Sequence, residues 1–203
     1  MPGHAGPIHL VIDSTGLKIV GDGEWHVIKH KPANKRRCWR KLHLGVDAGG
    51  FIVASELTES GVDDGSVGAT MIRGQGAGIE RFTADVAYDT RAIYEALAAV
   101  GGVHVVIPPN SEATPSRARD EVLRQRDAAI VRIAEVGRRR WRKEAGAHRQ
   151  ARAENAMLRY KRIIGEALRA RKMATQATEA RIGVSVLNRM TTLGKPNSVA
   201  VIP

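Results

Sequence analysis

The chain has 203 residues and carries 32 Lys and Arg against 21 Asp and Glu, a formal net charge of +11. Apolar residues make up 43% of the sequence, which is typical of a folded protein and excludes a chain that is disordered throughout. This length is enough for one domain with a substantial core, so we expect a single domain over residues 1–203. The one cysteine, Cys38, excludes a disulfide scaffold and favours a reducing compartment.

No segment has the pattern of a membrane span. The most apolar stretch, residues 92–109, is interrupted by Glu95, two glycines and His104. The first seven residues also lack the charged-then-apolar layout of a signal peptide. We therefore expect a cytoplasmic protein with no membrane partner.

The positive charge is concentrated in two clusters. Residues 111–172 hold 18 Lys and Arg against 8 Asp and Glu, with the densest run at 138–143, and residues 29–41 hold seven Lys and Arg without an acid. Each cluster contains a tryptophan, Trp39 or Trp141, as suits a surface that follows phosphates and stacks on bases. A solvated helix face is the alternative interpretation. We predict a nucleic acid as the partner, bound through Lys29, Lys31, Arg36, Arg37, Arg40, Lys41, Arg138, Arg139, Arg140, Arg142, Lys143, Arg149, Arg152 and Lys161.

The first half of the chain alternates between strand and helix patterns. An apolar run at 8–12 predicts a buried strand that ends in a turn at 13–16. Residues 40–46 and 51–57 are separated by turn residues and predict a hairpin. After them we expect a helix over 65–73, a strand over 81–85, a helix over 89–100 that stops at Gly101-Gly102, and a strand over 103–107.

The second half has helix patterns only. Residues 110–147 form a basic, helix-permissive stretch that we interpret as an exposed insertion, with helical sequence over 116–140. Two further helices are predicted over 153–170 and 178–193. The order predicts an α/β fold, a central sheet flanked by helices, with the basic insertion before the last two helices.

Two aspartates follow apolar strand patterns. Asp13 ends the first run, and a carboxylate at the end of a buried strand is costly unless a cation or backbone N–H groups compensate it. Taken alone, Asp13 more often caps a turn. Asp85 ends the strand over 81–85 with no helix to cap, whereas Asp89 has the position of a helix N-cap. Asp85 is therefore the functional candidate of the two.

A third carboxylate, Glu154, begins a helix rich in Arg and Lys. On a regular helix Glu154 and Lys161 lie two turns apart and so share a face. The pair is compatible with a weak surface ion pair, and equally with a metal ligand beside a phosphate-binding cation.

Three blocks of sequence, in order, resemble bacterial insertion-sequence transposases of the DDE type. The first runs over 9–25 (HLVIDSTGLKIVGDGEW) with 37–43 (RCWRKLH), the second over 84–90 (ADVAYDT) with 107–109 (IPP), and the third over 154–161 (ENAMLRYK) with 187–190 (LNRM). The resemblance covers nearly the whole chain. It implies a ribonuclease-H-like sheet, a catalytic and metal-binding triad of Asp13, Asp85 and Glu154, and self-association on DNA.

The implied reaction is cleavage and strand transfer at the inverted repeats of an insertion sequence. Two Mg²⁺ or Mn²⁺ ions ~4 Å apart suit such a triad, because hard cations prefer carboxylate oxygens. No His and Cys set here has zinc spacing. We expect a protein of the cytoplasm that is nucleoid-associated when it is bound to DNA.

The chain departs from the family in two ways. Ala147 and Gln150 stand where the family usually has Tyr and Arg, with Arg149 and Arg152 nearby. Only a dozen residues precede Asp13, so we expect a catalytic domain without the upstream region that recognises transposon ends. These departures favour an alternative, a truncated DNA-binding remnant without catalysis, whereas the intact triad opposes it.

Overall fold

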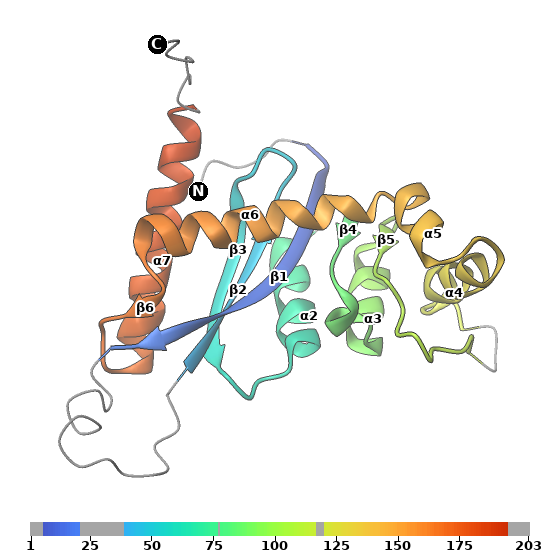
Figure 1. Ribbon diagram of the computed structural model, residues 1–203, viewed down its shortest axis with the longest axis horizontal. Coiled ribbons are helices and arrows are strands. Elements are labelled where there is room, and N and C mark those ends of the chain that lie inside the picture. The colour runs from blue at the N-terminus through green and yellow to red at the C-terminus, as the bar shows by residue number, and fades with distance from the viewer. Residues whose placement is uncertain (1–5, 21–38, 77, 117–119, 195–203) are drawn as a thin grey trace, which may run out of the picture.

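A mixed sheet is the centre of the computed structural model, which describes residues 6–20, 39–76, 78–116 and 120–194. The strand order is β3-β2-β1-β4-β5, and the short β6 pairs with the far end of β1 (Figure 1). The strands β1–β3 form an antiparallel meander, while β4, β5 and β6 run parallel to the strands they pair with. The bounds are β1 Ile8–Ile19, β2 Trp39–Val46, β3 Ile52–Glu59, β4 Ile79–Thr83, β5 His104–Val106 and β6 Ala167–Leu168.

Helices cover both faces of this sheet. Leu10 and Ile12 of β1 pack into a core with α2 (Asp64–Gln75) and α3 (Arg91–Val100). Val11 and Leu17 point to the other face, where α6 (Ala151–Arg159) and α7 (Met173–Thr192) cover them. Because β1 is buried on both faces, it is the central strand that its continuous apolar run predicts. The α/β, ribonuclease-H-like architecture expected from the sequence is confirmed.

Strand β1 is longer than the sequence predicts. Instead of turning at residues 13–16, it continues to Ile19, and Asp13 to Gly16 pair with Leu44 to Lys41 of β2. The polar run is accommodated because the strand is held by β2 along this stretch. Gly16 also leaves room for the Trp39 ring, which would lie 3.1 Å from a β-carbon at that position. The prediction that Asp13 ends a strand was therefore wrong.

The basic insertion forms separate helices at one end of the molecule (Figure 1). Gly137, at φ +81°, separates α4 (Arg124–Val136) from α5 (Arg138–Glu144), so the helix-permissive insertion forms two helices there and not one. A 3₁₀ turn, η2 (Ala147–Gln150), then leads into α6. The conformation at Gly137 is one that side chains with a β-carbon rarely adopt, which explains the break.

The helix predicted over 153–170 is also interrupted. Regular α6 ends at Arg159, a π-helical turn, η3 (Tyr160–Ile164), follows, and Gly165 at φ +128° ends it. The chain then adds β6 to the sheet. The change of pitch means that Glu154 and Lys161 do not share one regular helix face, contrary to the spacing inferred from the sequence.

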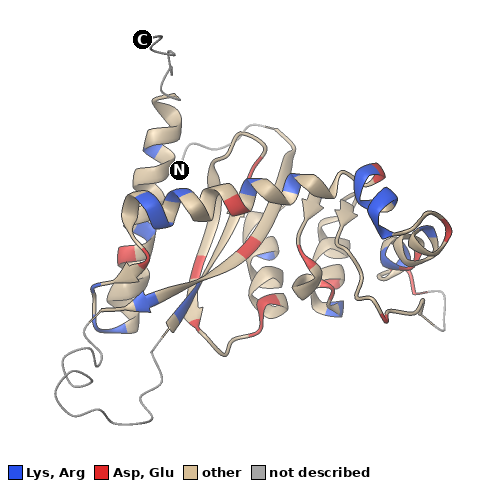
Figure 2. Ribbon diagram, viewed as in Figure 1, with Lys and Arg blue, Asp and Glu red and all other residues tan. Residues whose placement is uncertain are grey.

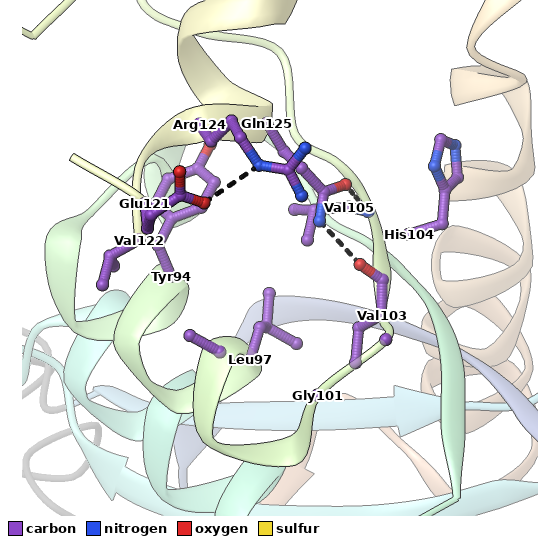
Figure 3. A pocket seen from close by; sticks show the side chains of 12 residues that line it. Tyr94, Leu97, Gly101, Val103, His104, Val105, Glu121, Val122, Arg124 and Gln125 are labelled. Atoms are coloured by element: carbon purple, nitrogen blue, oxygen red, sulfur yellow. Dashed lines mark hydrogen bonds and ion pairs between the residues drawn. The ribbon is translucent and has the colours of Figure 1, made fainter. Parts of the chain in front are cut away.

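Polar contacts, more than a core, attach α4 to the domain. No residue of α4 is buried. The Gln125 amide accepts a hydrogen bond from the Val105 backbone N–H at 2.9 Å and donates one to the Val103 carbonyl at 2.7 Å. Figure 3 shows Gln125 beside an open cavity of about 420 Å³ between α3 and α4. Gln125 thus occupies the free edge of β5 as a neighbouring strand would.

We predict that Gln125→Ala loosens the insertion. The substitution leaves the Val105 N–H and the Val103 carbonyl without their partner, at a cost of about 1–3 kcal/mol. Faster amide hydrogen exchange at Val105 and faster proteolysis within residues 120–144 are the expected results. Val131→Ala, a half-exposed position on the same helix, serves as the control and should change neither. Unchanged exchange at Val105 in Gln125→Ala contradicts the prediction.

Candidate active site

Asp13 and Asp85 lie just past the end of the parallel ladder between β1 and β4. The last residues paired in this ladder are Val11 and Thr83, so Asp13 lies two residues further along β1 and Asp85 lies two residues past Thr83, in the loop after β4. Parallel strands are ~4.8 Å apart, and residues two apart return to the same face. Since Val11 packs under α6 and α7, Asp13 is placed toward that layer. Asp85 lines a cavity with Ala151 and Glu154 of α6.

Glu154 approaches from the helix that crosses this face. It lies in the first turn of α6 and is exposed. Asp85 and Glu154 line one open cavity of about 450 Å³, whose wall also includes Arg142, Lys143, His148 and Gln150. The three carboxylates come from β1, from the loop after β4 and from α6, which are far apart in sequence.

The carboxylates influence one another electrostatically. The pKa of Asp13 is raised to about 6, chiefly by burial and also by the charges of Asp85, Glu154 and Asp64, against a hydrogen bond from the Ser14 N–H. Burial also raises the pKa of Asp85, with a contribution from Asp64, although the Ala87 N–H donates to its carboxylate. In the described residues none of Asp13, Asp85 and Glu154 forms an ion pair. Burial and mutual repulsion without a cation leave this acidic cluster poorly compensated.

The donor set is suited to a hard cation, although it is not closed. Carboxylate oxygens are the preferred protein ligands of Mg²⁺, which also keeps waters and substrate phosphate as ligands. Within the described ranges, no three His, Cys, Asp or Glu side chains are already arranged around one metal position. Asp13 of β1, Asp85 of the loop after β4 and Glu154 of α6 are the carboxylates that would supply oxygen ligands to such an ion.

We predict that Asp13 makes the unfolding free energy pH-dependent in the absence of divalent ions. Its pKa is about 6 in the folded protein, against an ordinary value of 3.8, so between these values the folded state binds the proton more readily. Stability from this group therefore rises as the pH falls from about 7 to 4. Thermal unfolding in EDTA should show this rise in the wild type and a smaller one in Asp13→Asn. Equal pH profiles in the two proteins contradict the assignment.

The roles of Asp85 and Asp89 differ from those inferred from capping. Asp85 does cap a turn, the 3₁₀ helix η1 (Val86–Tyr88), through its bond with the Ala87 N–H. Asp89 is not the N-cap of α3, because Thr90 holds that position without a side-chain bond. The Asp89 carboxylate instead accepts from Arg126 Nε at 2.9 Å and from the Tyr94 hydroxyl at 3.1 Å. Asp89 is compensated by a cation and Asp85 is not.

Asp64 is a fourth carboxylate near the site, and the sequence analysis did not single it out. It lies in the first turn of α2 and binds Lys41 Nζ at 3.0 Å, with His43 Nδ1 at 3.5 Å. Its charge contributes to the raised pKa of Asp13 and of Asp85. The Asp63-Asp64 pair was visible as an acidic helix start, but nothing in its spacing connected it with the triad.

The predicted DNA-binding residues of the first cluster fall into two groups. Lys29, Lys31, Arg36 and Arg37 lie outside the described residues. Arg40 and Lys41 are in β2 and make intramolecular contacts, Arg40 with Gln176 Oε1 at 2.9 Å and Lys41 with Asp64. The Trp39 ring lies over Gly16, with the Lys18 ammonium 6.0 Å from the ring centroid.

The densest part of the cluster over residues 111–172 is the run 138–143, which forms a band of Arg and Lys on α5 (Figure 2). Arg138 donates to the Pro109 carbonyl at 2.7 Å, and Arg140 pairs with Glu144 at 3.0 Å. The other three cations of α5 are exposed: Arg139, Arg142 and Lys143. Trp141 is buried, with 6% of its surface exposed, so its predicted role in base stacking was wrong. An aromatic residue on an otherwise charged seven-residue helix attaches that helix to the body.

The segment before Glu154 shows how the chain accommodates its unusual residues. Gln150 Nε2 donates to the Ile12 carbonyl at 3.2 Å, one residue before Asp13, and within the described residues the buried Oε1 has no hydrogen-bond partner. Arg152 lies beside His9. Lys161 is half-buried in η3. Gln150 therefore connects η2 directly to the strand that carries Asp13.

None of the described helices is both long enough and apolar enough to cross a bilayer.

The cavity near the end of the parallel strands β1 and β4 is bordered by carboxylates and cations. Its lining residues include Asp85 and Glu154, which belong to the second and third sequence blocks that resemble DDE transposases.

A comparison with protein-family models gives a match to the transposase DDE domain over residues 4–189. The matched span includes β1, the β4 loop and α6, and therefore all three carboxylates described above. Because it covers most of the 203 residues, it confirms the resemblance noted in the sequence. The chain belongs to the transposase DDE domain family, and DNA transposition is the process in which it takes part.

Proposed function

We propose that the protein cleaves DNA at insertion-sequence ends and transfers the freed strand, using Asp13, Asp85 and Glu154 with Mg²⁺ or Mn²⁺. The observation that carries the proposal is Asp85, which lines one cavity with Glu154 just past the end of the β1–β4 ladder, while the charges of both residues raise the pKa of Asp13 on β1. Double-stranded DNA is the substrate class, since the same cavity is bordered by Arg142 and Lys143.

The carboxylates would bind the metal ions, and the neighbouring cations would bind the DNA. Asp13 and Asp85 would hold the metal ions from the sheet, and Glu154 would complete the oxygen ligands from α6. Two such ions, when bound, stabilise the attacking and leaving oxygens of an in-line phosphoryl displacement. Arg142 and Lys143 would hold the phosphodiester by charge. Gln150 positions the start of α6 against the strand of Asp13.

A DNA-binding remnant without catalysis is the second candidate. The observation that favours it is Gln150, whose amide binds the Ile12 carbonyl and supplies no positive charge to a phosphate. The two candidates agree on DNA binding and differ only in chemistry. A nicking assay therefore separates them.

The test uses the full chain and a duplex that carries the terminal inverted repeat, with Mg²⁺, Mn²⁺ or EDTA. Cleavage at the repeat end in either metal and none in EDTA is expected. Binding to the duplex with no cleavage under any of these conditions supports the remnant instead.

We predict that the exposed cations of α5 dominate the salt dependence of DNA binding on this face. Each neutralised phosphate contributes about −0.9 to the slope of log K against log salt. Arg142→Ala with Lys143→Ala should therefore flatten the slope by about two. Arg138→Ala, which loses a bond to the Pro109 carbonyl, is the matched control and should change the slope little. Titrations by fluorescence anisotropy at several salt concentrations measure the slope. An unchanged slope in the double variant would show that Arg142 and Lys143 are only part of a solvated helix face and do not contact DNA.

A further inference from the structure

A row of basic side chains crosses the sheet on the same face as the active site. His9 of β1 pairs with Arg81 of β4, and Arg81 pairs with His104 of β5. Residues in register on neighbouring parallel strands point the same way, so the three side chains form one row. The next row in the direction of the site is Val11, Thr83 and Val106, and the row after that begins with Asp13 and Asp85.

Two more arginines lie above this row. Arg152 Nη1 is 3.4 Å from His9 Nδ1. A β-carbon on Gly146 would lie 3.3 Å from Arg81 Nη2 and 3.8 Å from Arg149 Nε, so both guanidinium groups gather at that point of η2. Gly146 adopts φ +68°, which lets the backbone turn closely around them. We refer to His9, Arg81, His104, Arg149 and Arg152 as the cationic row.

The cationic row is not neutralised within the described chain. Burial and the charges of Arg81, Arg152, Arg149 and His104 lower the pKa of His9 to about 4. Burial lowers the pKa of Arg81 and of His104 as well, and the charged groups that add to these shifts are again cations. With a pKa of about 4, His9 is neutral at pH 7. The charge of the row is therefore that of the arginines Arg81, Arg149 and Arg152, which form no ion pair within the described residues. Cations held together without an acid favour a bound anion.

Hydrogen bonds fix the row in a receptive arrangement. His9 Nε2 lies 2.9 Å from Thr83 Oγ1. When the other ring nitrogen, Nδ1, accepts a hydrogen bond from Arg152, Nε2 carries the proton and donates to Thr83. Arg81 donates from Nη2 to the Ala145 carbonyl, whereas its Nε is buried without a hydrogen-bond partner in the described residues. Arg149 and Arg152 are half-buried and His104 is exposed, so a ligand can reach the row from solvent.

We propose that the cationic row is a second phosphate site, which binds a phosphodiester of the DNA away from the bond that is cut. This inference rests on the proposed function only for the identity of the ligand, which is DNA. The arrangement of the basic side chains does not depend on that function. His9 and Asp13 lie on one face of β1, four residues apart, which corresponds to ~13 Å. One turn of duplex spans ~34 Å. A single DNA segment can therefore reach both the cationic row and the carboxylates.

The test measures DNA binding in EDTA, so it does not depend on cleavage. The full chain is titrated by fluorescence anisotropy against a 30-base-pair duplex (roughly three turns) that carries the terminal repeat. Arg81→Gln should weaken binding about tenfold or more, as expected for lost charge-assisted bonds, and flatten the salt slope by about 0.9. Arg73→Gln, an exposed position on α2 across the sheet, should change neither.

A scan of neutral methylphosphonates over one turn on each side of the cleavage position then locates the phosphate. At one position the substitution should weaken binding of the wild type about tenfold but leave the affinity of Arg81→Gln unchanged. Arg149→Gln repeats the comparison, because Arg81→Gln also loses the bond to Ala145, and thermal melting checks that both variants fold.

Three outcomes overturn the assignment. The first is that no methylphosphonate position is coupled to Arg81 or Arg149. The second is that both variants bind the duplex like Arg73→Gln. The third outcome is a site for a free anion. In that case inorganic phosphate, at matched ionic strength, competes with DNA for binding to the wild type but not to Arg81→Gln, and no methylphosphonate position is coupled to Arg81. If the wild type shows no metal-dependent cleavage but a methylphosphonate position is still coupled to Arg81 and Arg149, the proposed function is refuted and the phosphate site is not.

Discussion

Asp85→Asn should abolish metal-dependent cleavage and leave the protein at least as stable as the wild type. The amide keeps the shape of the side chain and removes a charge that a metal ion needs, so we expect a loss beyond about 100-fold, the upper range for groups that only support a metal ligand. Because burial raises the pKa of Asp85, its charge opposes folding. Its removal in EDTA should therefore not lower the melting temperature.

Asp89→Asn is the matched control for this experiment. The same substitution four residues away removes the partner of Arg126, so it should lower the melting temperature while cleavage stays measurable. The nicking assay and thermal melting are run on both variants, with duplex binding measured in parallel. If Asp89→Asn is inactive but stable while Asp85→Asn still cleaves, the roles of the two residues are reversed.

The sequence predicted the layers of this fold because apolar periodicity reports burial directly. The β2–β3 hairpin and the parallel strands after it follow from alternation and turn residues. It did not predict that β1 continues through Asp13 to Ile19, because that stretch is stabilised by pairing with β2 rather than by its own residues. Nor did it predict the π-helical turn η3, where Gly165 ends the helix ahead of β6.

The candidate site was predicted in part for similar reasons. Strand ends and a helix start indicated Asp13, Asp85 and Glu154, but the local rule used to separate Asp85 from Asp89 was wrong. Capping depends on where a helix begins to within one residue, and the N-cap of α3 is Thr90, one residue later than the predicted Asp89. What distinguishes the two aspartates is a long-range contact, Arg126 with Asp89, from a helix that follows 35 residues later in the chain.

Charge runs were the least transferable signal. A run of cations predicts a basic surface, but it does not tell which members are already paired. Arg138, Arg140 and Lys41 are engaged within the protein, whereas Arg142 and Lys143 border the cavity. Arg81 and His9, in contrast, come from mixed strand sequences and become a cluster only when the register of three strands brings them together.

Asp89→Ala should be the most destabilising of the single aspartate substitutions. Its side chain is 4% exposed and pairs at 2.9 Å with Arg126, itself 18% exposed, so truncation leaves a largely buried guanidinium without its partner. Breaking such a pair costs about 3 kcal/mol or more, which is ~6–12 °C in melting temperature for a chain of this size. The loss also releases the Tyr94 hydroxyl and the Asn110 N–H, which both donate to Asp89.

Asp63→Ala provides a calibrated comparison, since Asp63 is a true N-cap that accepts from the Ser66 N–H at 2.7 Å. Loss of that cap should cost about 1 kcal/mol, or ~2–4 °C. Replacing both members of the buried pair, Asp89→Leu with Arg126→Met, should recover part of the stability lost in Asp89→Ala, because no unpaired charge remains. Equal losses in Asp63→Ala and Asp89→Ala, or a double variant less stable than Asp89→Ala, would show that the ion pair between Asp89 and Arg126 of α4 contributes little to stability.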